Sequence, residues 1–153
     1  MIQDALAMLA SAQTLTSTAD SSDFMDLGPM GNSLNSNTSR DIGNGENLFL
    51  ALNVLTAFTA STAATMTPTI VCSPTSSFAS TFTVLTGTAL TSANLASTGL
   101  VAIYRLPPSD NWRRYVKGTW TVATGPFTAG VLQASIVKDI NRWKALATGF
   151  HIS

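Results

Sequence analysis

The chain has 153 residues, of which 45% are hydrophobic and only 10% are charged, and its eight basic side chains balance its eight acidic ones. This length fits one domain with an ordinary hydrophobic core. The zero net charge argues against bulk nucleic-acid binding, which needs a basic excess, and a single cysteine, Cys72, excludes an internal disulfide framework.

Residues 1–13 place apolar side chains close to helical spacing, with Ile2, Leu6 and Leu9 among them. We therefore expect a short helix or an ordered arm over this segment. A helix of this length is marginal by itself and has to dock on another surface. Ile2, Leu6 and Leu9 are therefore candidates for contact with a partner protein.

From residue 14 onward, threonine alternates with apolar residues, which is typical of β-strands. Glycine and proline divide this part of the chain into short segments. The strands that we predict are, in chain order, 15–18, 23–27, 47–58, 64–72, 78–85, 99–106, 115–123 and 129–138. Their number and spacing predict an all-β fold, an antiparallel β-sandwich of the jelly-roll type over residues 14–139. Residues 140–153 are predicted to form a tail after the sandwich.

The charges are distributed unevenly along the chain. Residues 47–104 contain no Asp, Glu, Lys or Arg, most acids lie in the first third, and most bases lie in the last third. We expect the acids and bases to pair with one another within the fold; the alternative is an interface that holds a partner through complementary fields. The long uncharged stretch argues against an enzyme, because acid–base and electrostatic catalysis need ionisable groups.

Residues that could carry catalysis or bind a metal are scarce. The only histidine, His151, lies in the predicted tail, where a rigid catalytic arrangement is seldom built. Cys72 sits in an apolar run and is expected to be a small buried side chain. We therefore predict no catalytic residue, no cofactor and no metal. The apolar run 48–58 is shorter than the roughly 20 residues of a membrane-spanning helix, so no membrane contact is expected.

Segment 111–120 is the one cluster that resembles a binding site, because aromatic and basic side chains are interleaved along it. Such residues could stack on single-stranded bases, but arginine, tryptophan and tyrosine also dominate protein interfaces. Side chains alternate between the two faces of a strand, so Arg114 is expected on the face opposite Tyr115. We favour protein contact over nucleic acid, and the candidate interface residues are Trp112, Arg113, Arg114, Tyr115 and Lys117.

The predicted tail contributes two further apolar candidates, Trp143 and Phe150. Large apolar side chains near a chain end need cover from water. Either their own domain or a neighbouring subunit can supply that cover, and the sequence leaves both arrangements open.

Several short stretches, which span most of the chain, match a known family in the right order. The most telling is 40–50, which reads Arg-Asp-Ile-Gly-Asn-Gly-Glu-Asn-Leu-Phe-Leu, and the others are 1–6, 12–16, 25–28, 114–117 and 127–130. On these residues the chain resembles the jelly-roll capsid cement proteins of short-tailed bacteriophages, of the type known from a Bordetella phage. It departs from that pattern in a longer polar loop at 28–40 and in a longer tail after Asp139.

The resemblance implies a structural virion protein that is made in the host cytoplasm and binds the outer capsid surface. There it would cement neighbouring major capsid protein subunits, as a homo-oligomer with a dimer favoured over a trimer. The family implies no catalytic residue. Two alternatives are a carbohydrate- or receptor-binding jelly roll of a tail or fibre, with Trp112 beside Asp110 as its candidate pair, and a single-strand-binding barrel, which the zero net charge disfavours.

Overall fold

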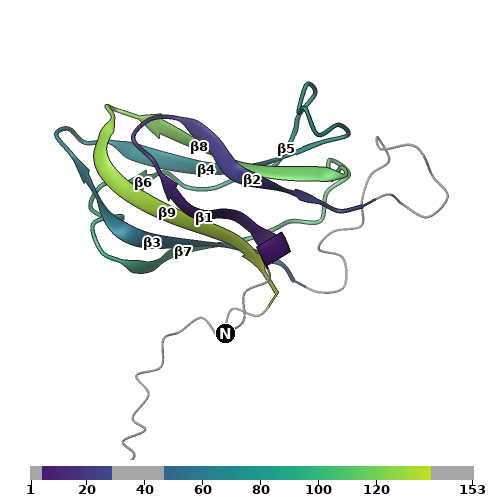
Figure 1. Ribbon diagram of the computed structural model, residues 1–153, viewed down its shortest axis with the longest axis horizontal. Coiled ribbons are helices and arrows are strands. Elements are labelled where there is room, and N and C mark those ends of the chain that lie inside the picture. The colour runs from purple at the N-terminus through teal and green to yellow at the C-terminus, as the bar shows by residue number, and fades with distance from the viewer. Residues whose placement is uncertain (1–4, 29–46, 139–153) are drawn as a thin grey trace, which may run out of the picture.

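The computed structural model describes residues 5–28 and 47–138, which form two antiparallel β-sheets packed face to face (Figure 1). The four-stranded sheet has the order β1-β9-β3-β7, and the five-stranded sheet has the order β2-β8-β4-β5 with the short β6 paired to β4. In chain order the elements are a 3-10 turn, η1 (Ala5–Ala7), then β1 (Met8–Thr14), β2 (Ala19–Asp26), β3 (Phe49–Ala60), β4 (Thr65–Ser73), β5 (Phe82–Thr86), β6 (Leu90–Thr91), β7 (Gly99–Arg105), β8 (Tyr115–Ala123) and β9 (Phe127–Val137).

This strand order is that of a jelly roll. Strands β4 and β5 pair as the innermost hairpin, and the pairs β3·β7, β2·β8 and β1·β9 follow outward along the chain. Because the whole paired ribbon rolls up, β3 also meets β9 and β4 also meets β8, which completes the two sheets. The predicted antiparallel jelly-roll sandwich is confirmed.

Alternation of side chains fixes which face of each strand enters the core. In β3, Leu50, Leu52 and Val54 are almost completely buried, and in β8 the inward positions are Val116, Gly118 and Trp120. The core between the sheets is closed by large aromatic side chains. A Cβ atom at Gly118 would lie 2.5 Å from the Trp120 ring, so this position has to be glycine for the indole to fit.

The N-terminal segment differs from the expected helix or arm. Residues 8–14 form β1, the edge strand of the four-stranded sheet, and pair with β9. Leu9 and Ala10 are completely buried in the core. Residues 15–18, predicted as a strand, form the turn into β2 instead, with Leu15 buried. Apolar residues at short spacing fit either an amphipathic helix or a buried strand, and pairing with β9 decides for the strand.

Gly130 is required by the bend of β9. Its φ angle is +151°, and a Cβ atom there would lie 2.3 Å from the Phe58 ring. We predict that Gly130→Ala lowers the free energy of unfolding by about 1–3 kcal/mol, because the Phe58 ring has to move within a packed core. Chemical denaturation measures this loss. Gly28→Ala is the matched control for backbone conformation, since its φ is also positive but no atom lies within 4 Å of the added carbon; equal losses in both variants would contradict a packing cause.

Candidate functional site

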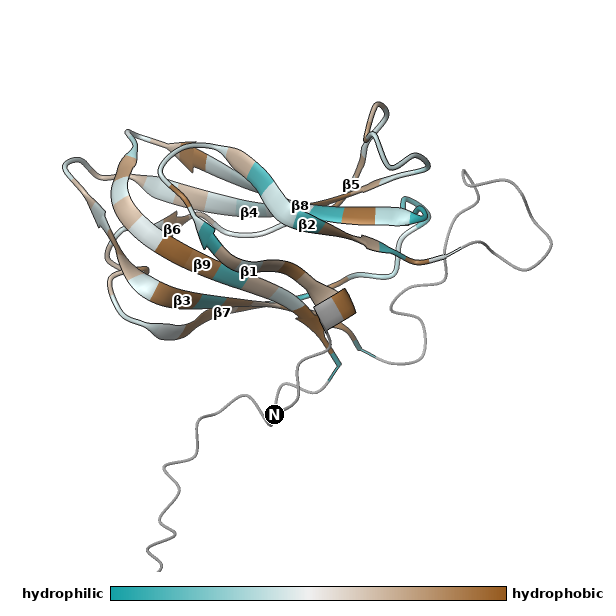
Figure 2. Cartoon of the chain, viewed as in Figure 1, coloured by the Kyte–Doolittle hydropathy of each residue, from teal (hydrophilic) through white to brown (hydrophobic). Residues whose placement is uncertain are grey.

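The two sheets differ in the charge that they carry. Among the described strands, β1, β3, β7 and β9 contain one charged residue, Arg105, whereas β2 and β8 contain three aspartates and Lys117. Figure 2 shows the corresponding hydrophilic positions along β2 and β8. The five-stranded sheet therefore presents the chemically distinctive outer face.

Two ion pairs join β2 to the region of β8. The Arg114 guanidinium donates to both carboxylate oxygens of Asp26, over 2.7 and 2.8 Å, and the Lys117 Nζ lies 2.5 Å from Asp20. This bidentate contact raises the pKa of Arg114 above its ordinary value. Two acids of the first third thus pair with two bases of the last third, as expected for pairing within the fold.

Ionisation of Asp20 makes the stability of the fold depend on pH in the acidic range. Partial burial works to raise the pKa of this carboxyl, but hydrogen bonds from Lys117 and Thr119 and the Lys117 charge outweigh it and lower the pKa below 3.8. Because the pKa of Asp20 is lowered in the folded state, its ionised form stabilises the protein at pH values above the ordinary pKa of the carboxyl. This stabilisation disappears as the pH falls through the folded-state pKa.

We therefore predict that Asp20→Asn lowers the melting temperature at pH 7 and that the difference from the native chain shrinks as the pH falls below about 4. Melting curves by circular dichroism across this range measure the effect. Asp110→Asn is the control, because Asp110 has no cation within ion-pairing distance among the described residues. A difference for Asp20→Asn that is the same at every pH would contradict the prediction.

Aromatic rings gather beside these ion pairs on the outer face. The Phe24 ring makes edge contacts with Phe78 and Tyr115, both with centroids 5.8 Å apart. The Lys117 Nζ lies 4.4 Å from the Phe78 centroid, and the Arg114 guanidinium carbon lies 4.9 Å from that of Tyr115. We call Phe24, Phe78, Tyr115, Lys117 and Arg114 the aromatic patch. Its most exposed ring is Phe24, at 49%.

Loop geometry brings Phe78 into this patch. Phe78 lies in the connection between β4 and β5 and has a φ of +52°, a conformation that residues other than glycine seldom adopt. Its backbone N–H donates to the Thr75 carbonyl over 3.1 Å. Phe78 falls within the predicted strand 78–85, and neither Phe24 nor Phe78 stands out in the sequence as a contact residue. A lone phenylalanine in each of two distant segments carries no local signal that the rings will meet.

The residues predicted from segment 111–120 separate into two groups. Tyr115 and Lys117 share the outer face of β8, whereas the guanidinium carbon of Arg113 lies 4.4 Å from the centroid of Phe82, which pairs with the buried Cys72. Arg114, expected on the opposite face, lies over Tyr115 instead. It precedes the first residue of β8, so strand alternation does not apply to it.

Trp112 lies in the core and not on the surface. Its side chain is 1% exposed, and its indole N–H donates to the Pro107 carbonyl over 3.0 Å. It therefore cannot form an exposed sugar platform with Asp110. Leu9 is likewise buried and cannot contact a partner directly. Three other predicted contact residues, Ile2, Trp143 and Phe150, lie outside the described residues.

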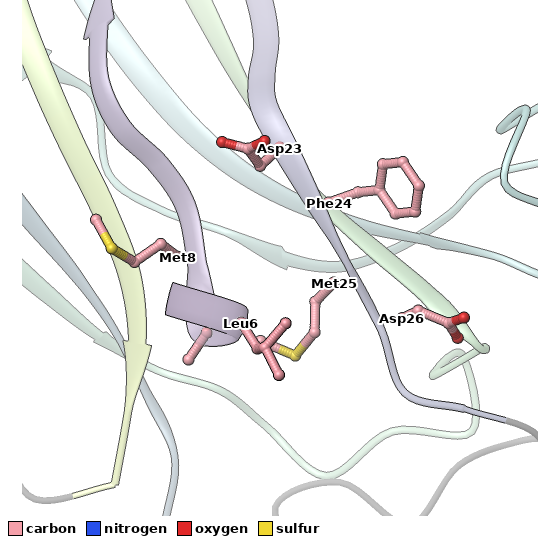
Figure 3. Close-up of a pocket in the computed structure, with 7 residues that line it drawn as sticks. Leu6, Met8, Asp23, Phe24, Met25 and Asp26 are labelled. Carbon is pink, nitrogen blue, oxygen red and sulfur yellow. The ribbon is translucent and has the colours of Figure 1, made fainter. Parts of the chain in front are cut away.

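A groove separates η1 from β2 beside the aromatic patch (Figure 3). Leu6 and Met25 extend toward each other across it, Asp23 lies on the same side of β2 as Met25, and Asp26 points to the other side. Leu6 is 81% exposed, the largest exposed fraction among the exposed large hydrophobic side chains. The groove is lined by Leu6, Ala7, Met8, Asp23, Phe24, Met25 and Asp26.

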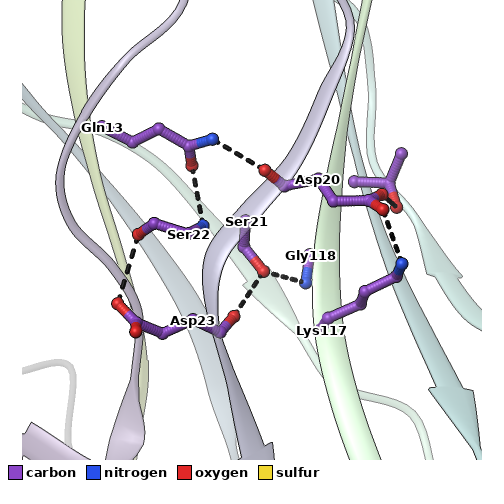
Figure 4. A network of polar contacts seen from close by, with 8 residues as sticks. Gln13, Asp20, Ser21, Ser22, Asp23, Lys117 and Gly118 are labelled. Carbon is purple, nitrogen blue, oxygen red and sulfur yellow. Dashed lines mark hydrogen bonds and ion pairs between the residues drawn. The ribbon is translucent and has the colours of Figure 1, made fainter. Parts of the chain in front are cut away.

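Gln13 of β1 joins the two sheets (Figure 4). Its amide nitrogen donates to the Asp20 carbonyl over 2.7 Å, and its amide oxygen accepts the backbone N–H of Ser22 over 3.2 Å. The same oxygen accepts the indole N–H of Trp120. The β2 edge is thus tied to β1 by a side chain, because β1 and β2 belong to different sheets.

The described residues show no other reactive centre. They contain no group of three or more metal-ligating side chains, and none of their helices is long and apolar enough to cross a membrane. Cys72 is buried, and this burial raises the pKa of its thiol to about 11. The expected buried cysteine is confirmed.

A family model for Bbp16 matches residues 9–136, which begin in β1 and end in β9 and so include both sheets. The chain belongs to the Bbp16 family. This confirms the resemblance drawn from the sequence, since the family is that of a Bordetella phage capsid cement, or decoration, protein. No curated protein matches the chain. As a member of the Bbp16 family it is a phage structural protein associated with the virion, and such a family implies no enzymatic activity.

Proposed function

We propose that this Bbp16-family protein binds the outer surface of an assembled phage capsid and cements neighbouring major capsid protein subunits. The observation that carries the proposal is the family match over residues 9–136, which includes every strand of both sheets. A jelly roll with extensive strand pairing is a rigid body, and a rigid body that contacts two subunits resists their separation. The cementing is entirely noncovalent.

The outer face of β2 and β8 is the surface that we propose for the capsid contact. The aromatic patch offers large rings that lose little conformational entropy on binding, and such residues with arginine supply most of the affinity at protein interfaces. Its cations are already neutralised by Asp20 and Asp26, so docking leaves no unpaired charge. Arg113 and Leu6 lie outside this patch and remain proposed contacts. Ile2, Trp143 and Phe150 remain proposed contacts from the sequence alone.

We also propose that the protein acts as a homo-oligomer, with a dimer favoured over a trimer. Twofold assemblies are by far the commonest among homo-oligomers. Two or more linked copies would engage adjacent capsid subunits together, so that weak single contacts give firm attachment through a high effective concentration.

Sedimentation with capsids that lack decoration tests the function directly. The purified protein is mixed at rising concentration with such capsids, and the copies that sediment with them are counted. Cementing predicts saturation at a fixed ratio to the major capsid protein and a higher temperature of capsid disruption. Binding that never saturates, or saturation without any gain in capsid stability, would contradict the proposal.

Salt dependence distinguishes an aromatic contact from an ionic one. We predict that capsid binding changes little between roughly 0.1 M and 1 M NaCl, although the Debye length falls from about 10 Å to about 3 Å over this range. The reason is that apolar and ring contacts are not screened, and the patch cations are paired within the chain. The sedimentation assay at each salt concentration measures it; an affinity that falls in step with the Debye length would contradict the prediction.

A further inference from the structure

The groove between η1 and β2 has the properties of a docking site for a peptide segment. Its apolar walls come from Leu6 of η1 and Met25 of β2, whose side chains extend toward each other (Figure 3). Leu6 is 81% exposed and adjoins Met25, which is partly exposed, so apolar side chains face water at this place (Figure 3). Exposed apolar side chains that adjoin one another mark a surface that binds something.

The rim of the groove adds a charge. Asp23 accepts a hydrogen bond from the Ser22 hydroxyl but has no cation within ion-pairing distance among the described residues. The other lining carboxylate, Asp26, is paired with Arg114. The groove therefore suits an occupant that combines apolar side chains with a positive charge close to Asp23.

The chain has such a segment directly after β9 in the sequence. Residues 139–153 contain Trp143 and Phe150 together with Arg142 and Lys144. They follow β9, whose Ser135 pairs with Met8, a lining residue of the groove. Fifteen residues extend over roughly 50 Å, so the segment can pass η1 and reach the groove. Figure 1 shows the end of β9 beside η1.

We propose that residues 139–153 dock into the groove between η1 and β2 of their own chain, with Trp143 against the apolar walls and Arg142 or Lys144 beside Asp23. Connection to the same domain gives the segment a high effective concentration at this site, which a second copy does not have in dilute solution. Residues 1–4 are less suited to the groove, because Asp4 would meet the Asp23 carboxylate there. The inference concerns the protein before it meets a capsid, and it does not depend on the proposed cementing function.

Disulfide trapping in the full chain tests the docking. Ala7→Cys in the groove is combined with Ala145→Cys in a Cys72→Ala background, and the rate of disulfide formation within one chain is followed on non-reducing gels in dilute protein. The matched control places the groove cysteine at Ser97 instead. Ser97 is exposed and follows Leu95 by two residues. The Leu95 carbonyl accepts the backbone N–H of Phe58, which lies near the C-terminal end of β3, whereas Phe49 begins that strand.

We expect the link from Ala7 to form at least about tenfold faster than the link from Ser97. Adding Arg142→Glu and Lys144→Glu should slow it, and adding Asp23→Lys to that variant should restore the rate. Similar rates from Ala7 and Ser97 would overturn the proposal. A linked dimer as the main product would also overturn it, because a second copy would then supply the segment, and so would a link that forms only after capsids are added. Circular dichroism of each variant confirms that the sandwich is folded.

Discussion

Trp120→Ala is expected to lower the free energy of unfolding by about 3–5 kcal/mol, the usual cost of removing a buried tryptophan from a core. Trp120 is completely buried, and its ring fills the space that Gly118 leaves open. The substitution leaves a cavity between the sheets that its neighbours cannot close without moving paired strands. Since domains are stable by only about 5–15 kcal/mol, the variant should unfold at a much lower denaturant concentration.

The Trp120 ring and its N–H group can be tested separately. The indole N–H donates to Gln13 Oε1 over 2.9 Å, and Gln13 also ties β1 to β2. Trp120→Phe keeps most of the ring and removes the donor, so we expect a smaller loss of about 1–2 kcal/mol. Urea denaturation followed by circular dichroism measures both variants. If Trp120→Ala cost no more than Trp120→Phe, the packing explanation would be wrong.

Phe24→Ala is expected to weaken capsid binding by about 10- to 30-fold while changing stability little. Phe24 is the central ring of the aromatic patch, in contact with Phe78 and Tyr115, yet 49% of it faces water. In the free protein the truncated side chain is largely exposed, so little packing is lost. In the complex the same ring is a buried anchor, and anchors of this kind contribute about 1–2 kcal/mol or more to the binding free energy at interfaces. The measurement is the binding curve from capsid sedimentation.

The opposite sheet supplies a matched control for this prediction. Leu55 lies on β3 and is 45% exposed, close to the value for Phe24 on β2. Leu55→Ala removes an exposed apolar side chain of similar accessibility from the uncharged sheet and should leave capsid binding unchanged. If Leu55→Ala weakened binding and Phe24→Ala did not, the capsid would dock on the four-stranded sheet, and the proposed contact surface would be wrong.

The correspondence between sequence and structure is close where the pattern is local. Strand β8 spans Tyr115–Ala123, as predicted from alternation alone, and β7 and β4 agree within a residue or so. β8 up to Trp120 and β4 up to Ile70 bury every second residue, so their periodicity is visible in the sequence. The agreement is poorer at β5, which begins at Phe82 and not at residue 78, because the turn that holds Phe78 contains apolar residues that resemble a strand.

The candidate site was only partly predictable. Arg113, Tyr115 and Lys117 could be selected because aromatic and basic residues adjoin one another in the sequence. Phe24 and Phe78 could not, since they enter the patch from β2 and from the β4–β5 connection. Trp112 was selected for the surface by composition, but its hydrogen bond to Pro107 satisfies the indole inside the core. Burial of an amphipathic ring depends on a partner that the local sequence does not reveal.

Length, composition and alternation by themselves determined that this protein is a β-sandwich with a long uncharged central stretch, and they predicted pairing between its acids and bases. These properties follow from which residues must avoid water and which charges must pair, and both are counted along the chain. Only the tertiary structure decided that residues 8–14 are a sheet strand, that Leu9 is core, and that the rings of the aromatic patch meet. Those outcomes depend on pairing between segments far apart in the chain, because the roll brings β1 to β9 and β2 to β8.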